Sequence, residues 1–192
     1  MLRTYNYTNA IIIFMEIYMP TVILDAGHGG SDFGAVYEGR REKDDNLALT
    51  LAIGDILAEN GVNVLYTRTN DVYETPTAKA LEGNASGADY FISIHRNSSP
   101  MPNQYTGIES LVYNRNSTAG NIATNINQNL EALGFANQGV NPRTNLAVLR
   151  RTTMPAVLVE AGFINNDRDN ELFDAQFDQI AQAIADGILE SI

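Results

Sequence analysis

The sequence contains no cysteine, so disulfide bonds and thiolate metal sites are both excluded. It contains only two histidines, so a metal site would have to combine them with carboxylates. Lys and Arg number 12 against 23 Asp and Glu, which gives a formal net charge of -11 at pH 7. This balance argues against non-specific nucleic-acid binding, which needs clustered cationic side chains, and against docking on an anionic surface by charge alone.

Long apolar runs are also missing, and none reaches the length of a transmembrane helix. The apolar stretch 10–15 is interrupted by Glu16 and no small-residue cleavage pattern follows, so we expect no signal peptide. Met19-Pro20 directly precedes the first expected strand, and we therefore expect residues 1–18 to be an extension outside the fold. A chain of 192 residues that is 44% hydrophobic suits one globular domain, expected over 19–192 and most simply monomeric.

Short apolar runs alternate with segments of helical periodicity along the rest of the chain. This alternation predicts an α/β fold with a mostly parallel sheet and helices on both faces. We expect strands at about 21–25, 62–66, 90–95, 107–113, 146–149 and 156–160, and helices at about 47–60, 75–86, 118–133 and 178–191.

Both histidines directly follow or end expected strands. His28 comes after the first strand between glycines, His95 ends the third strand, and Glu42 opens an amphipathic run. Ligands of open α/β sheets bind outside the carboxyl ends of the strands, and catalytic zinc takes three protein ligands from His, Glu and Asp. The pattern therefore predicts a zinc site formed by His28, Glu42 and His95, against the alternative of two unrelated surface histidines.

Three further polar residues lie at or near strand ends. Glu160 ends an apolar strand, where it either faces water or lies at the mouth of the site and transfers a proton from water to a leaving amine. Asp25 either orients a histidine ligand or forms a turn. Asn97 follows His95 by two residues and either contacts substrate or forms a turn. The residues alone leave these alternatives open.

Four sequence segments together resemble one family. DAGHGG at 25–30, Glu42-Lys43, SIHRNS at 93–98 and LAVLRRTTMPAVLVEAGFINN at 146–166 occur in the order found in the zinc-dependent N-acetylmuramoyl-L-alanine amidases of the amidase-3 type. This family comprises cell-wall amidases of bacteria and of phage lysins. The resemblance extends from about Thr21 to the carboxyl end.

The resemblance implies a single α/β domain with a twisted, mostly parallel six-stranded sheet. It also implies hydrolysis of the peptidoglycan amide that joins the muramoyl lactyl group to the first L-alanine. Carried over by position, His28, Glu42 and His95 would bind Zn²⁺ and Glu160 would be the catalytic carboxylate. Without a signal peptide, the protein would reach the cell wall by another export route or on lysis.

The resemblance is not complete. The family usually has a small residue where this chain has Arg96, and the helix before the third strand has Lys79 where an arginine is common. No segment between the motifs is long enough for a helix that plugs the site, so we expect an open site. Two other functions stay open at this point: a zinc peptidase acting elsewhere on the stem peptide, and a wall-binding module without catalysis.

Overall fold

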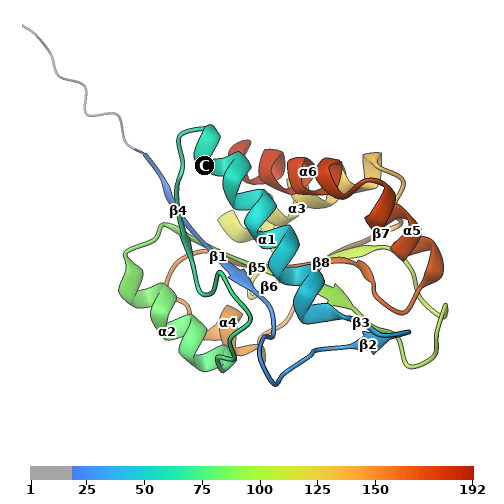
Figure 1. Ribbon diagram of the computed structural model, residues 1–192. Coiled ribbons are helices and arrows are strands. Elements are labelled where there is room, and N and C mark those ends of the chain that lie inside the picture. Colours follow the sequence, from blue (N-terminus) through green and yellow to red (C-terminus); the bar gives the residue numbers. More distant parts are fainter. Residues whose placement is uncertain (1–18) are drawn as a thin grey trace, which may run out of the picture.

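The structure, a computed structural model, describes residues 19–192. The expectations for residues 1–18 fall outside this part of the chain. Six strands form one sheet in the order β4-β1-β5-β8-β6-β7 (Figure 1). The pairs formed by β4, β1, β5 and β8 are parallel, whereas β6 is antiparallel to β8 and parallel to β7. The strands are β1 (Thr21–Ala26), β4 (Asn63–Tyr66), β5 (Tyr90–Asn97), β6 (Ile108–Val112), β7 (Asn137–Pro142) and β8 (Ala156–Phe163).

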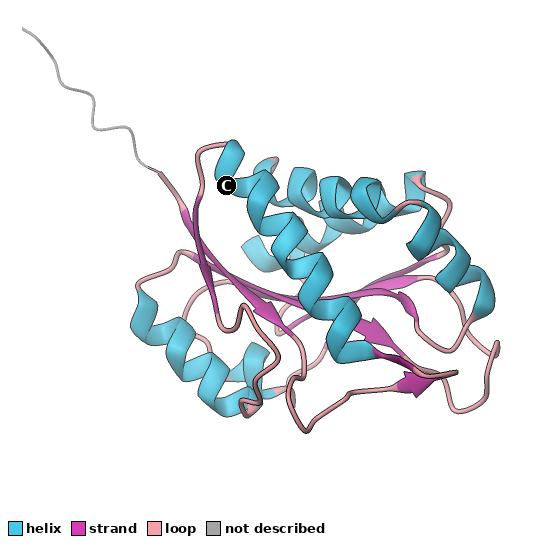
Figure 2. Ribbon diagram, viewed as in Figure 1, coloured by secondary structure: helices cyan, strands magenta, loops and turns pink. Residues whose placement is uncertain are grey.

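Helices cover both faces of the sheet (Figure 2). Side chains alternate along each strand, so Val22 and Leu24 enter one apolar core while Ile23 enters the other. The larger core lies under α1 (Glu42–Glu59), α3 (Thr118–Ala132) and α6 (Phe177–Leu189), and the smaller one is on the side of α2 (Pro76–Ser86) and α4 (Ala147–Arg150). The nine-residue helix α5 (Asp167–Ala175) lies between β8 and α6 in the chain.

The α/β class, the single six-stranded sheet and the helices on both faces confirm the expectation from the sequence. One expected strand, 146–149, is wrong. Leu146 is the N-cap of the short helix α4, which contains the residues that follow, and its carbonyl accepts a hydrogen bond from the N–H of Arg150. Four apolar residues in a row fit a buried strand or a buried helical turn equally well, so periodicity could not decide.

The sixth strand is instead β7, whose sequence NQGVNP gives no apolar signal. Such a strand is tolerated because β7 lies at the edge of the sheet, where proline at its end costs no ladder hydrogen bond. The short hairpin of β2 (Val36–Tyr37) and β3 (Arg40–Arg41), and helix α5, were also not expected. Over residues 19–192, no helix is both long enough and apolar enough to cross a membrane.

Helix α6 packs into the larger core, so we expect its buried side chains to contribute measurably to the free energy of unfolding. Ile184 is fully buried there, and Ile184→Ala should lower the free energy of unfolding by about 2–5 kcal/mol because it leaves a cavity. Leu81→Ala is the control, since Leu81 is 56% exposed and its truncation should change stability by about 0.5 kcal/mol or less. Urea unfolding of both variants measures this, and equal losses would contradict the assignment of the core.

Candidate metal centre

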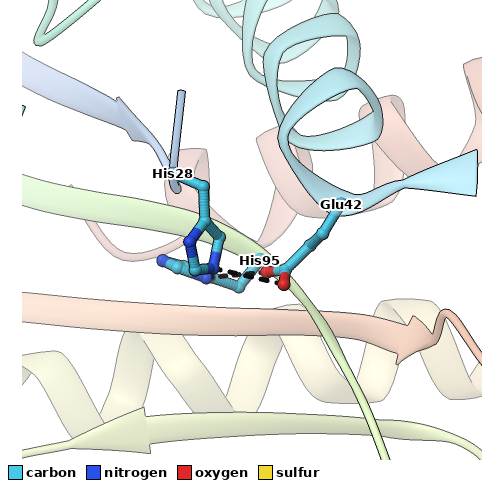
Figure 3. A group of neighbouring side chains, drawn as sticks. All are labelled: His28, Glu42 and His95. Carbon is cyan, nitrogen blue, oxygen red and sulfur yellow. Dashed lines mark hydrogen bonds and ion pairs between the residues drawn. The ribbon is translucent and has the colours of Figure 1, made fainter. Parts of the chain in front are cut away.

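Three side chains from separate elements converge at the carboxyl ends of β1 and β5 (Figure 3). Nε2 of His28 lies 3.2 Å from Oε2 of Glu42, and Nδ1 of His95 lies 2.9 Å from Oε1 of the same carboxylate. One donor atom of each residue lies within 4.8 Å of the other two. Two imidazole nitrogens and one carboxylate oxygen form a donor set that zinc binds with a position left for water, so these residues fit the metal.

Two glycines make room for these side chains. A Cβ on Gly27 would lie 2.3 Å from Cε1 of His95, and a Cβ on Gly34 would lie 2.5 Å from Oε2 of Glu42. Gly34 also has a positive φ of 65°, which other residues rarely adopt. These two glycines therefore allow the side chains of His95 and Glu42 to approach each other.

The loop after His28 determines where Glu42 lies. The N–H of Glu42 donates to the carbonyl of Ala35, and the N–H of Ala35 donates to Oε2 of Glu42. The first turn of α1 is thus bonded to the loop that precedes it instead of to a capping side chain. This reciprocal pairing turns the Glu42 carboxylate toward the two histidines.

Asp32 orients His28 through the imidazole nitrogen that does not face Glu42. Its Oδ2 accepts a hydrogen bond of 2.9 Å from Nδ1 of His28, which leaves Nε2 directed at Glu42. Burial disfavours the imidazolium, but the hydrogen bonds to Glu42 and Asp32 outweigh it and raise the pKa of His28 to about 9. Burial would likewise raise the pKa of Glu42, yet the hydrogen bonds from both histidines hold it well below its usual range. The site therefore favours positive charge beside Glu42.

Buried cations hold the backbone that carries His28, which itself has a positive φ of 59°. Arg68 donates to the carbonyls of Ala26 and Gly27, and Nζ of Lys79 donates to the carbonyl of Ala26. Lys43 donates to the carbonyl of Gly30. These bonds satisfy carbonyls that neither the sheet nor a helix can pair, and so they fix the loop.

Asp25 balances one of these cations. Its carboxylate lies 2.8 Å from Nζ of Lys79 and accepts hydrogen bonds of 2.7 Å from the hydroxyls of Thr67 and Ser93. Burial would raise the pKa of Asp25, but the charge and hydrogen bond of Lys79 and the hydrogen bond from Ser93 lower it. Asp25 is linked to the loop of His28 through Lys79, and a role in orienting the metal ligands stays a prediction.

Glu160 on β8 is the register partner of His95 on the neighbouring parallel strand β5. Its Oε2 is buried and has no hydrogen-bond partner among the described residues. Burial raises the pKa of Glu160 to about 7, with Glu42 and Glu109 adding to the rise and His95 opposing it. A carboxyl group with a free oxygen and such a pKa can accept or release a proton near neutral pH.

Asn97 follows on the same strand. Its Nδ2 is 3.4 Å from Oε2 of Glu109, and its Oδ1 accepts a hydrogen bond of 2.8 Å from the N–H of Ser98. Both contacts stabilise the carboxyl end of β5. A contact of Asn97 with substrate stays a prediction.

A groove of about 230 Å³ opens beside the two histidines. Part of its lining is apolar and comes partly from α4, the segment that the sequence pattern misassigned. Glu74, Asp32 and Lys79 are among its polar lining residues. The side chains of His28 and His95 are 25% and 18% exposed, so the centre is open to solvent on this side. The apolar lining residues are Leu146, Ala147, Val148 and Leu158.

Known proteins give an independent comparison. Residues 22–190 match the family model described as N-acetylmuramoyl-L-alanine amidase. The chain is 38% identical over 176 residues to a sporulation-specific N-acetylmuramoyl-L-alanine amidase of Bacillus subtilis, a match that covers 88% of this chain and 67% of the relative. It is 35% identical to the endolysin of Bacillus phage SPP1, over 88% of this chain and 65% of that protein.

Solved structures agree with the sequence relatives. The crystal structure of an N-acetylmuramoyl-L-alanine amidase from Clostridium difficile superposes with a TM-score of 0.84 at 31% identity, covering 90% of this chain and 96% of that one. The catalytic domain of the amidase CwlV from Bacillus (Paenibacillus) polymyxa gives 0.82 at 35% identity, with 90% and 97% covered.

The bond between Asp32 and His28 predicts a loss of metal affinity in Asp32→Asn. Removing the partner that orients a histidine ligand typically weakens metal binding about 10–100-fold. Asp44→Asn is a matched control, because Asp44 is 47% exposed against 43% for Asp32, lies in the first turn of α1 and pairs with Arg41. Zinc competition with a chromophoric chelator measures both, and equal affinities for the two variants would contradict the role of Asp32.

Proposed function

Because the chain belongs to the N-acetylmuramoyl-L-alanine amidase family, we propose that it is a zinc-dependent hydrolase of peptidoglycan. The bond cleaved is the amide between N-acetylmuramic acid and L-alanine. The observation that carries the proposal is the convergence of His28, Glu42 and His95, with Glu160 paired to His95 on the neighbouring strand. Residues 19–192 then form the catalytic domain, and the extension 1–18 lies outside it.

His28, Glu42 and His95 are the residues that would hold the zinc ion. A zinc ion held by these residues would polarise the amide carbonyl and would lower the pKa of bound water to roughly 7. The hydrogen bond from His28 to Asp32 keeps one imidazole nitrogen protonated and the other free for the metal. Gly27 and Gly34 keep the space into which His95 and Glu42 extend.

Glu160 is the proton carrier of the proposed reaction. Its unpartnered Oε2 accepts the proton of the attacking water and then delivers it to the nitrogen of the departing alanine. Both transfers need a carboxyl group whose pKa lies near the working pH, and burial of Glu160 supports this. The groove that is lined by α4 and by Glu74, Asp32 and Lys79 is the space that the substrate would occupy beside the histidines.

One relative is named a probable cell wall amidase and another an endolysin, and these names support action on the cell wall for this chain. The partner is therefore peptidoglycan, and we expect the domain to work as a monomer. The chain spans 67% of the Bacillus subtilis relative's length and 57% of a probable cell wall amidase of Staphylococcus aureus, so the function proposed is that of the matched domain.

Mapping the products of purified peptidoglycan tests which bond is cut. The proposed reaction releases the amino group of L-alanine and leaves the lactyl carboxylate intact. A new terminus farther along the stem peptide would instead show a zinc peptidase. Wall binding by zinc-loaded protein without any new terminus would show a binding module. Chelator treatment should abolish release of L-alanine termini, and added zinc should restore it.

Glu160→Gln should lower the rate of release by about 100-fold or more, because general acid–base catalysis contributes about that much. It should leave zinc stoichiometry at the wild-type value, since Glu160 is not among the three grouped donors. Glu59→Gln, which makes the same change at an exposed position of α1, should leave the rate unchanged. Normal activity of the Glu160→Gln variant would exclude Glu160 as the proton carrier.

A further inference from the structure

The residue after His95 carries a buried guanidinium on the opposite face of β5. Arg96 is among the largest fully buried side chains, and its side chain has no exposed surface. Burying a charged group is costly unless hydrogen bonds and an opposite charge compensate for it. The partners of Arg96 therefore indicate what the burial achieves.

The guanidinium of Arg96 joins three elements. Its Nη1 donates to Oδ2 of Asp45 on α1 at 2.7 Å, and its Nη2 donates to Oδ1 of Asn170 on α5 at 2.8 Å. Its Nε is 3.4 Å from the carbonyl of Gly162 on β8, and its Cζ lies 3.9 Å from the centre of the Phe173 ring. All three nitrogens and one face of the planar guanidinium thus make contacts, and the ammonium group of a lysine could not reproduce this set.

Two of the contacts of Arg96 lead to one metal ligand. Its backbone N–H donates to Oε1 of Glu42 at 3.2 Å, and its partner Asp45 lies in the same first helical turn as Glu42. Glu42 is therefore held by the backbone of Arg96 directly and by its side chain through α1. We propose that Arg96 is a positioning residue, which fixes the first turn of α1 against β5 so that the Glu42 carboxylate reaches both histidines. This inference rests on the proposed metal site.

Arg40 makes similar contacts with a different consequence. Its Nε donates to Oδ2 of Asp45 at 2.6 Å, and its Cζ lies 5.1 Å from the centre of the Phe173 ring. Arg40 precedes Asp45 by only five residues, whereas 51 residues separate Asp45 from Arg96. The Arg40–Asp45 pair is local to the start of α1, and the Arg40 guanidinium otherwise bonds Asp174 of α5. The Arg96–Asp45 pair instead joins that helix to β5.

Arg96→Gln and Arg40→Gln test this difference. We expect Arg96→Gln to bind zinc about 10–100-fold more weakly, the range seen when residues behind metal ligands are removed, and to shift the visible absorption bands of the cobalt-substituted protein. Arg40→Gln should lower the thermal midpoint of the metal-free protein yet keep wild-type zinc affinity and cobalt bands. Arg96→Lys should keep part of the affinity because it retains the charge.

Unchanged cobalt bands and zinc affinity in folded Arg96→Gln would overturn the proposal. If that variant does not fold, Asp45→Asn decides, because it weakens the same bridge with little change of shape. Wild-type affinity in Asp45→Asn would also overturn it. Failure of the proposed metal site is distinguishable, because wild-type protein would then bind neither zinc nor cobalt. Failure of the proposed reaction is also distinguishable, because wild-type protein would then release no L-alanine terminus, whereas failure of this inference leaves wild-type binding and cleavage intact.

Discussion

A carboxylate removed from water must be matched by hydrogen-bond donors and by positive charge, and the fold is organised to do this for Glu42. Its side chain is 5% exposed. It accepts hydrogen bonds from the N–H groups of Ala35 and Arg96 and from the side chain of Asn46. These donors come from the preceding loop, the central strand and the next helical turn. Together these donors place one carboxylate between two imidazoles, and the proposed divalent cation would add positive charge there.

Much of the architecture could be predicted from the sequence, because buried strands leave a strong local signal. The apolar runs of β1, β5 and β8 identified the three central strands that carry or adjoin His28, His95 and Glu160. The errors fall where the local signal is weak. The apolar segment of α4 is too short to show a period, and the polar edge strand β7 is defined by its pairing with β6 instead of by its own composition.

The residues of the candidate site also differ in how far the sequence could identify them. Residues placed by a strand end, such as His28 and His95, could be named because the topology of a parallel sheet brings strand ends together. Asp32, Arg68 and Lys79 could not, because their roles depend on which loop carbonyl or imidazole nitrogen lies within reach after folding. Asp25 illustrates the difference: its position beside the site was foreseeable, but its partners Lys79, Thr67 and Ser93 were not.

The reciprocal pairing of Ala35 with Glu42 has a consequence for protein engineering. Loops at the rim of an active site are usually where substrate preference is altered, but exchanging this loop would also remove a support of Glu42 and hence of the proposed metal centre. Helix α4 contributes Ala147 and Val148 to the groove, and among the described residues it makes no hydrogen bond to His28, Glu42 or His95. Val148 is also buried in the smaller core, whereas Ala147 is only partly buried. Changes of specificity are therefore best introduced at Ala147, where the side chain can vary without loss of the core or of the loop that holds Glu42.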